Sequence, residues 1–204
     1  MGSGVMNKSQ QMNWGGVKRL ILSDIDRRSR SNYKASWKDV FKSASLKLIL
    51  LFRLGSFFKT KGILLKPLYY VCLLIHRHYE HKLGIVLPIG TLIGPGLYIM
   101  HYSGIVINPR TIIGKNFTIM QCSTIGNVRS GKYQGVPVIG DNVVLSCNSV
   151  LIGNIKIGNN VMIGAGSIVT KNVEDGSTII GNPATIVNYN GKNNVQLYIT
   201  NVTI

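Results

Sequence analysis

The sequence predicts a mainly β protein, a parallel β-helix preceded by an α-helical segment. Two observations predict this fold: an aliphatic residue returns at every sixth position in runs between Leu87 and Val169, and a small residue often follows it, as in Ile157-Gly158. The period excludes an α-helix, which repeats every 3.6 residues, and a simple strand, which alternates with period two. Hexads instead describe the sides of a triangular coil, in which Gly permits tight corners and the aliphatic residues stack along the axis.

The hexad positions fall into three phased runs with two interruptions. They are Leu87, Ile93, Ile99 and Ile105, then Ile113, Ile119 and Ile125, then Ile139, Leu145, Leu151, Ile157, Ile163 and Val169. The first interruption adds two residues to a hexad, and the second, within 126–138, adds about eight. The longer insertion is polar and basic. Loops that project from a rigid scaffold commonly bind ligands, so we expect 126–138 to cover a ligand or a neighbouring subunit.

Charge and composition divide the chain into three parts. Residues 1–84 carry 16 basic and 4 acidic side chains, a net charge of +12, and are rich in apolar residues. Residues 85–187 form the hexad-repeat domain, and residues 188–204 form a tail. Val195, Leu197 and Ile199 stand at every second position of the tail, which is typical of a strand. The alternatives are a tail that packs on the last coil and a tail that is mobile.

The N-terminal part predicts helices after a basic arm. Residues 6–32 read as a solvated arm. A helix is expected over 36–58, and its first residue, a serine, is the predicted cap. A second apolar stretch contains Gly62 and Pro67 and ends near Ile75. Lysines and arginines interrupt both stretches before 18 apolar residues accumulate, so no transmembrane span is expected.

Three partner classes follow from these features. The basic apolar helices within 36–75 predict either a peripheral contact with the inner face of the cytoplasmic membrane or packing within the protein. The charge alone would suit nucleic acid, but no helix-turn-helix, zinc-finger or stacking motif accompanies it, so no nucleic-acid partner is predicted.

Three cysteines without framework spacing predict a cytoplasmic protein. His76, His78 and His81 lack a second ligand pair, so they predict surface histidines and no metal site.

His101 is the candidate for chemistry in the hexad domain. It is the only histidine after residue 84 and lies just before the first interruption. A neutral imidazole takes the proton of a hydroxyl group as that oxygen attacks a thioester. The alternative is a histidine with a purely structural role at a coil corner.

Several runs resemble the serine acetyltransferases and the polysaccharide O-acetyltransferases that share their core. They are HYSGIVIN (101–108), IGKN (113–116) and QCSTIG (121–126). The likeness covers about residues 85–187 and includes both interruptions. It implies a left-handed β-helix, acetyl-CoA as co-substrate, a homotrimer with its sites between adjacent solenoids, and His101 as the catalytic base.

Two later runs are similar to the acetyl-CoA-binding coils of the wider group, which includes galactoside acetyltransferases. They are IGAGSIVTK (163–171) and GNPA (181–184). The resemblance implies contacts with the cofactor at Ala165, Thr170 and Lys171. It also places Cys147 where a backbone amide faces the thioester oxygen and stabilises the oxyanion. Tight corners also require small residues, and Lys171 also suits a solvated surface.

The departures from the serine acetyltransferase pattern concern the acceptor. Met100 stands where that family places an Asp before the catalytic His, Val136 replaces its loop His, and Val86 replaces the carboxylate that orients the base. Met100, Asn108 and Val136 are the candidate substrate contacts. Because these changes remove charges that would hold a zwitterion, the sequence favours a different acceptor.

The resulting prediction is an acetyl-CoA-dependent O-acetyltransferase that acts by direct transfer, without a metal, on a sugar hydroxyl of a surface polysaccharide or glycan precursor. Three alternatives stay open: a serine O-acetyltransferase, an amino-sugar N-acetyltransferase and a catalytically inactive β-helix scaffold.

Overall fold

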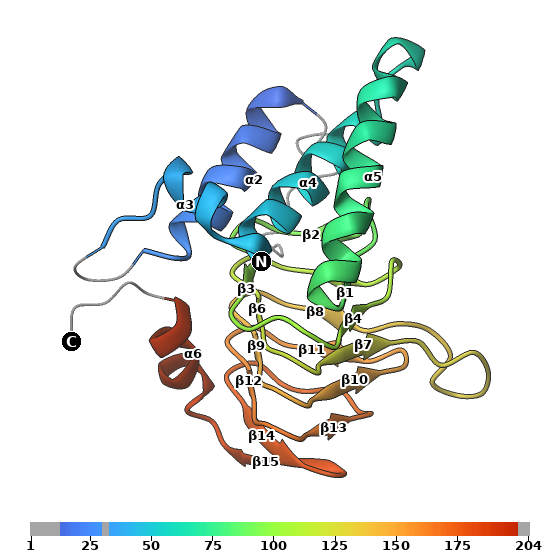
Figure 1. Cartoon of the computed structure of the whole chain (residues 1–204). Helices are drawn as coiled ribbons and strands as arrows, with labels where there is room; N and C mark the ends of the chain where they lie inside the picture. Colours follow the sequence, from blue (N-terminus) through green and yellow to red (C-terminus); the bar gives the residue numbers. More distant parts are fainter. Residues whose placement is uncertain (1–12, 30–32, 200–204) are drawn as a thin grey trace.

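The fold is a triangular β-helix with four α-helices over its first coil (Figure 1). The computed structural model describes residues 13–29 and 33–199. Each of the first four coils of the β-helix contributes one short strand to each of three faces. All strand pairs along the faces are parallel except β14 with β15, which is antiparallel.

The three faces are sheets whose strands come from successive coils. The first face consists of β1 (Ile85–Val86), β4 (Ile105–Ile107), β7 (Thr124–Gly126), β10 (Val150–Ile152) and β13 (Ile168–Val169). The second consists of β2 (Leu92–Ile93), β5 (Ile112–Ile113), β8 (Val138–Ile139) and β11 (Lys156–Ile157). The third consists of β3 (Tyr98–Ile99), β6 (Thr118–Ile119), β9 (Val144–Leu145), β12 (Met162–Ile163), β14 (Thr178–Gly181) and β15 (Ala184–Asn188).

The predicted hexad residues form the axis of the helix. All thirteen are buried, and none is more than 3% exposed. Equivalent positions pair from coil to coil, as Ile99 with Ile119 and Ile119 with Leu145. Stacking of aliphatic side chains at the strand spacing of about 4.8 Å therefore makes one continuous core.

One corner of the triangle carries a ladder of asparagines. Asn116, Asn142 and Asn160 have left-handed backbone angles, with φ of 56°, 55° and 55°. Asn tolerates this region because its short amide side chain bonds locally. Here the amides bond to one another: Asn116 Nδ2 donates to Asn142 Oδ1 at 2.8 Å, and Asn142 Nδ2 donates to Asn160 Oδ1 at 2.9 Å. The ladder satisfies polar groups that a tight corner would otherwise leave without partners.

The basic arm predicted for residues 6–32 is wrong where the structure describes it. Residues Trp14–Asp26 form the helix α2, capped by the Asn13 side chain, which accepts from Gly16 N at 2.6 Å. Its buried face follows a helical period and includes Val17, Leu20, Ile21, Asp24 and Ile25. The buried face packs on α4, so tertiary contacts stabilise this helix.

The helix predicted over 36–58 is divided in two. Ser36 caps α3 (Trp37–Lys42) in a capping box with Asp39, and Ser43, in an extended conformation, caps α4 (Ala44–Lys59). A 3-10 turn, η1 (Ile63–Leu65), leads to α5 (Lys66–Leu83), which runs past Ile75 and ends at the left-handed Gly84. None of the helices among the described residues is long and apolar enough to cross a membrane.

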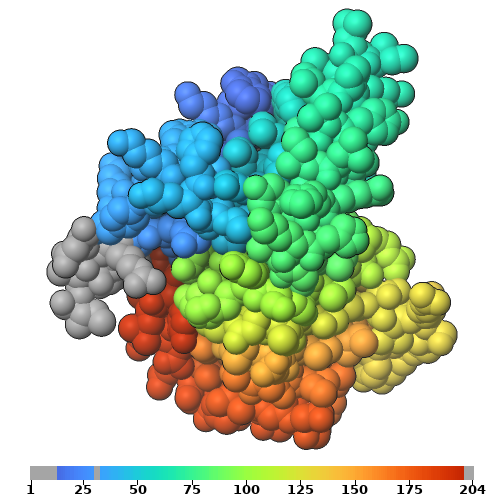
Figure 2. Space-filling view, viewed as in Figure 1, coloured from blue at the N-terminus to red at the C-terminus, as the bar shows by residue number. Residues whose placement is uncertain are grey.

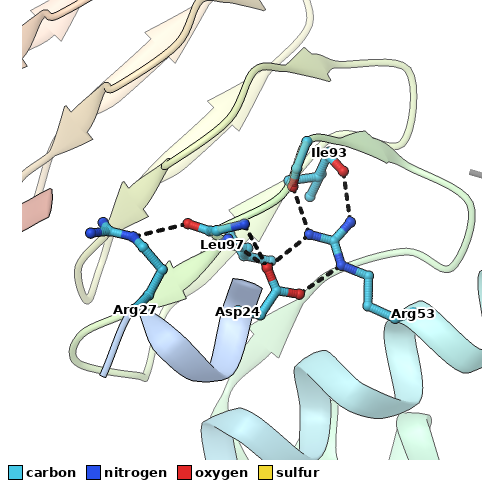
Figure 3. A network of polar contacts seen from close by, with 7 residues as sticks. Asp24, Arg27, Arg53, Ile93 and Leu97 are labelled. Atoms are coloured by element: carbon cyan, nitrogen blue, oxygen red, sulfur yellow. Dashed lines mark hydrogen bonds and ion pairs between the residues drawn. The ribbon is translucent and has the colours of Figure 1, made fainter. Parts of the chain in front are cut away.

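A buried ion pair joins the helices to the first coil (Figure 3). Arg53 of α4 bonds Asp24 of α2 through Nε at 2.8 Å and Nη2 at 3.1 Å. Arg53 also donates to the carbonyls of Ile93 and Gly94, at 2.6 and 2.7 Å. Asp24 Oδ1 accepts from the amides of Gly96 and Leu97, at 2.9 and 2.7 Å. The pair thus bonds to backbone groups of the first coil.

A second buried arginine fixes the C-terminal helix. Arg27 donates to Gly96 O and Thr118 Oγ1, and its Nη1 donates to the last carbonyls of α6, those of Tyr198 and Ile199, at 2.9 Å each. Burial lowers the pKa of Arg27 to about 10, so it stays charged at neutral pH. A cation suits a helix C-terminus, where carbonyls lack partners.

The strand alternative for the tail is therefore wrong. Residues Gly191–Ile199 form α6, with Val195 buried and Leu197 exposed. Its last turn is held by Arg27, which is far away in the sequence, so the alternation of three residues did not reveal the helix.

We predict that Asp24→Ala lowers the free energy of unfolding by about 3–5 kcal/mol, because it leaves the buried Arg53 charge without its partner. Urea unfolding followed by circular dichroism measures the change. Lys18→Ala, an exposed position on the same helix, is the control and is expected to stay within about 0.5 kcal/mol of wild type. Equal stabilities of the two variants would contradict the role given to the ion pair.

Candidate active site

His101 lies on the edge of the β-helix where the third face turns into the first. The same edge contains the equivalent turns of the next coils, at 120–123, 146–149 and 164–167. Backbone bonds tie these turns together: Cys122 N donates to Ser103 O, Asn148 N to Gln121 O, and Gly166 N to Cys147 O, at 2.8, 3.1 and 3.0 Å. We call this line of turns the His101 edge.

The imidazole of His101 is exposed and projects from an irregular turn. Ser103 and Gly104 in this turn have positive φ, 105° and 66°. Within the described residues, His101 has no hydrogen-bond partner. Val86, where the family pattern calls for an orienting carboxylate, lies exposed on β1 and pairs with Val106. The imidazole is therefore accessible to a substrate. No carboxylate of the described residues bonds to it and fixes its tautomer.

Cys147 and Ala165 share the edge with His101. They are the equivalents of His101 two and three coils further along, so Cys147 is about 10 Å from it along the axis. No described residue accepts a hydrogen bond from the Cys147 amide. Ala165 and Gly166 are exposed, and a Cβ on Gly166 would meet nothing within 4 Å. The edge thus offers a backbone donor and open backbone beside it.

The other predicted residues lie on the next edge, where the first face turns into the second. Asn108 is used by its own turn, since its Oδ1 accepts from Arg110 N at 3.0 Å. Val136 is half-buried in the projecting loop, which Figure 1 shows at the side of the β-helix. Thr170 and Lys171 line a pocket of about 160 Å³ together with Pro183 and the start of β15, including Ala184. The structure therefore separates the predicted residues into two groups on either side of the first face.

A polar pocket of about 320 Å³ adjoins the turn of His101, and sequence reasoning missed it. Its lining residues are Arg28, Asp39, Lys42, Ser43, Ala44, Ser45, Met100 and Tyr102. Met100 and Tyr102 are the neighbours of His101 in the chain, and the others come from the N-terminal helices. The available signals were the capping-box pattern at Ser36 and the basic run that contains Arg28.

The pocket holds charges of both signs. Arg28 Nη1 donates to Ser43 Oγ at 3.0 Å, which holds the guanidinium at the start of α4. Hydrogen bonds from the Tyr33 hydroxyl and the Ser36 amide lower the pKa of Asp39 below its usual value, so it is a carboxylate at neutral pH. Lys42 adds a second cation. Such a pocket suits a small molecule that carries both a carboxylate and an ammonium group.

The histidines on α5 form no metal site in the structure. His76 is buried, with Nδ1 3.5 Å from Glu80 Oε2, while His78 and His81 are exposed. Buried His76 differs from the surface position predicted for it, because it faces α4 in the helix packing. Among residues 13–29 and 33–199, no group of three or more His, Cys, Asp and Glu side chains could hold a metal ion.

Comparisons with known proteins agree on one group. The family model "Bacterial transferase hexapeptide (six repeats)" matches residues 137–171. A serine acetyltransferase from Staphylococcus epidermidis is 43% identical over 74 residues, which are 36% of this chain and 35% of that protein. The serine acetyltransferase of Neisseria gonorrhoeae, solved in complex with serine, has a TM-score of 0.70 and 26% identity, over 88% of this chain and 72% of that chain.

The chain is therefore similar to hexapeptide-repeat proteins of the serine acetyltransferase type. This confirms the resemblance and the left-handed β-helix that the sequence predicts. A serine acetyltransferase solved in complex with CoA shares the fold, with a TM-score of 0.68 and 20% identity, over 88% of this chain and 73% of that chain. The chain spans about a third of the length of the curated relatives it matches.

The predicted sugar hydroxyl acceptor, and with it a part in polysaccharide biosynthesis, is wrong. The similar proteins are serine acetyltransferases, which was one of the alternatives. The prediction rested on missing charges at Met100, Val136 and Val86. In the structure, the N-terminal helices place Arg28, Asp39 and Lys42 in the same pocket as Met100. A neutral residue at one position of a pocket therefore does not make the pocket neutral.

Proposed function

We propose that this protein transfers the acetyl group of acetyl-CoA to the hydroxyl of L-serine. The observation that carries the proposal is the pocket with both charges beside His101. The similarity to serine acetyltransferases, one of them in complex with serine, supports it. Serine carries a carboxylate, an ammonium group and a hydroxyl, which match the two kinds of charge and the base.

Three side chains hold the acceptor in this proposal. Arg28 and Lys42 bind its carboxylate, and Asp39 faces its ammonium group. Charge-assisted hydrogen bonds are stronger than neutral ones, so a compact site of this kind both binds serine and orients its hydroxyl towards the coil edge. Exclusion of molecules without a carboxylate follows from the same contacts.

His101 acts as the general base. It takes the proton of the serine hydroxyl as the oxygen attacks the acetyl carbonyl, and a new C–O bond forms. The Cys147 amide stabilises the negative oxygen of the tetrahedral intermediate. The C–S bond then breaks, and the proton held by His101 passes to the thiolate of CoA. The products are O-acetylserine and CoA, and no acyl-enzyme forms.

The CoA chain follows the small residues of the His101 edge. Exposed Ala165 and Gly166 leave room for the pantetheine arm to lie against the backbone. Thr170 and Lys171 contact the cofactor from the pocket on the neighbouring edge. Asn108 and Val136 stay weaker candidates, since Asn108 is used by its turn and Val136 is half-buried.

We also propose a homotrimer with its sites between protomers. Within one protomer, His101 and Lys171 lie on different edges and about three coils apart, which is roughly 14 Å along the axis. A neighbouring solenoid, packed against the first face, would bring a Lys171 to the His101 edge. The family resemblance supports this arrangement.

We predict that His101→Ala lowers kcat for L-serine by about 10²- to 10⁴-fold, because the hydroxyl loses its base. Thiol release from acetyl-CoA measures the rate, and binding of CoA, followed by calorimetry, should not change. His81→Ala, an exposed histidine on α5, is the control. Normal turnover by His101→Ala would exclude it as the base.

Lys42→Gln is expected to raise KM for L-serine about tenfold with little change in stability, because one charged contact to the carboxylate is lost. Serinamide, which lacks the carboxylate, should show no such change. Lys38→Gln, on the same helix but outside the pocket, is the matched control. An equal effect of both substitutions on KM would rule out the assigned contact.

Co-expression of His101→Ala with Lys171→Ala tests the shared site. With random mixing in a trimer, about one site in four regains both side chains, so thiol release at low acetyl-CoA should rise well above that of either variant alone. No recovery in mixed trimers would place both side chains in one protomer. A fully active monomer in sedimentation would also contradict the shared site.

A further inference from the structure

The hairpin of α4 and α5 projects from the body of the protein (Figures 1 and 2). At its tip, Ile63 and Leu64 are 75% and 90% exposed. The exposed apolar surface continues down α5 through Leu68, Tyr70, Val71, Leu74 and Ile75. We call these residues, from Ile63 to Ile75, the hairpin face.

The hairpin face follows a helical period. Leu68, Val71 and Ile75 of α5 stand three and four residues apart, so they lie on one side of the helix, and Leu64 precedes them in η1. The neighbouring strip of α5, about a quarter turn round the helix, contains Cys72, His76 and Leu83 and is buried. The helix therefore has two apolar sides, and the described chain covers one of them.

The charges around this face are of one sign. No Asp or Glu occurs between Asp39 and Glu80, whereas that interval has seven Lys and Arg residues. Arg53 is used in the buried ion pair. Lys59, Lys61 and Lys66 flank the tip in the sequence. Lys59 Nζ donates to Ile89 O at 3.1 Å, whereas Lys66 is exposed, as is Arg77 further down α5. An exposed apolar face bordered by cations is typical of helices that lie in the interface of an anionic membrane.

We propose that the hairpin face binds an anionic phospholipid surface. The apolar residues of the tip would enter the headgroup region, while the exposed cations Lys66 and Arg77 reach the lipid phosphates with their long side chains. Self-association through the same face fits less well, because an isologous contact would bring the cations of both copies together and offers Glu80 as the nearest acidic residue. The inference concerns a surface remote from His101 and does not depend on the acceptor.

The test is flotation of the full chain with vesicles of phosphatidylcholine alone or with 30% phosphatidylglycerol, a composition of about physiological charge density. We expect binding to the mixed vesicles at low salt, weak binding to phosphatidylcholine, and loss of binding at high salt because the charges are screened. Leu64→Glu should reduce the partition coefficient at least tenfold, and Lys66→Gln about fivefold.

Matched variants distinguish vesicle binding through the hairpin face from nonspecific binding through other exposed apolar or basic residues. Phe41→Glu removes an equally exposed apolar residue from α3, and Lys132→Gln removes a cation from the loop of the β-helix; neither should change binding more than about twofold. Circular dichroism of each variant checks the fold.

Three results would overturn the proposal. They are absence of wild-type binding at low salt, equal losses in Leu64→Glu and Phe41→Glu, and a fall in oligomer mass of Leu64→Glu in sedimentation without vesicles. The last result would show that the hairpin face is a contact between copies of the chain.

Discussion

In the first coil of a β-helix, the backbone N–H and C=O groups on the outer side have no preceding coil to bond with. The ion pair of Asp24 and Arg53 supplies hydrogen-bond partners for these groups. In the second coil, Ile113 O accepts from Gly94 N of the coil above it. The equivalent carbonyl of the first coil, Ile93 O, accepts instead from Arg53. Asn116 N donates to Pro95 O, and its equivalent, Gly96 N, donates to Asp24. The two side chains thus replace the missing coil, and buried polar groups stay paired.

The same pair sets the position of the N-terminal helices. Because it joins α2 and α4 to one coil, it also fixes the start of α3 and α4 relative to the turn of His101. Arg28 and Lys42 then lie beside Met100, and the polar pocket exists only in this arrangement. A structural ion pair at the end of the solenoid therefore determines the geometry of the proposed acceptor site.

The β-helix was predictable from the sequence because its period is local and repeated. Each hexad repeats the same pattern of one aliphatic residue that points to the axis, and all thirteen of these residues are buried. The N-terminal helix α2 was missed because Asp24 interrupts its apolar stripe, and the partner that makes its burial tolerable, Arg53, lies 29 residues away. The helix α6 was missed for the same reason, as it depends on Arg27. Patterns within one segment do not reveal such pairs.

The site was predictable in part. His101, Cys147 and Ala165 were selected by resemblance, and the coil repeat places them on one edge. The acceptor was predicted wrongly because Met100 and Val136 were judged singly, whereas the pocket combines residues near 28 and 42 with residues near 101. Which side chains share a pocket depends on how the helices pack, and the local patterns of a single sequence do not reveal that packing.

The reversed last strand also bears on how molecules of this kind avoid joining end to end. A parallel solenoid presents, at its open end, a template on which the next coil or a second molecule could continue as a fibre. Here β15 turns back across β14 and spans five residues, where the coil strands β9 and β12 have two. A further coil would meet a strand of the wrong direction and length. With helices over the other end, the stack is finite, and its edges stay available for ligands rather than for growth.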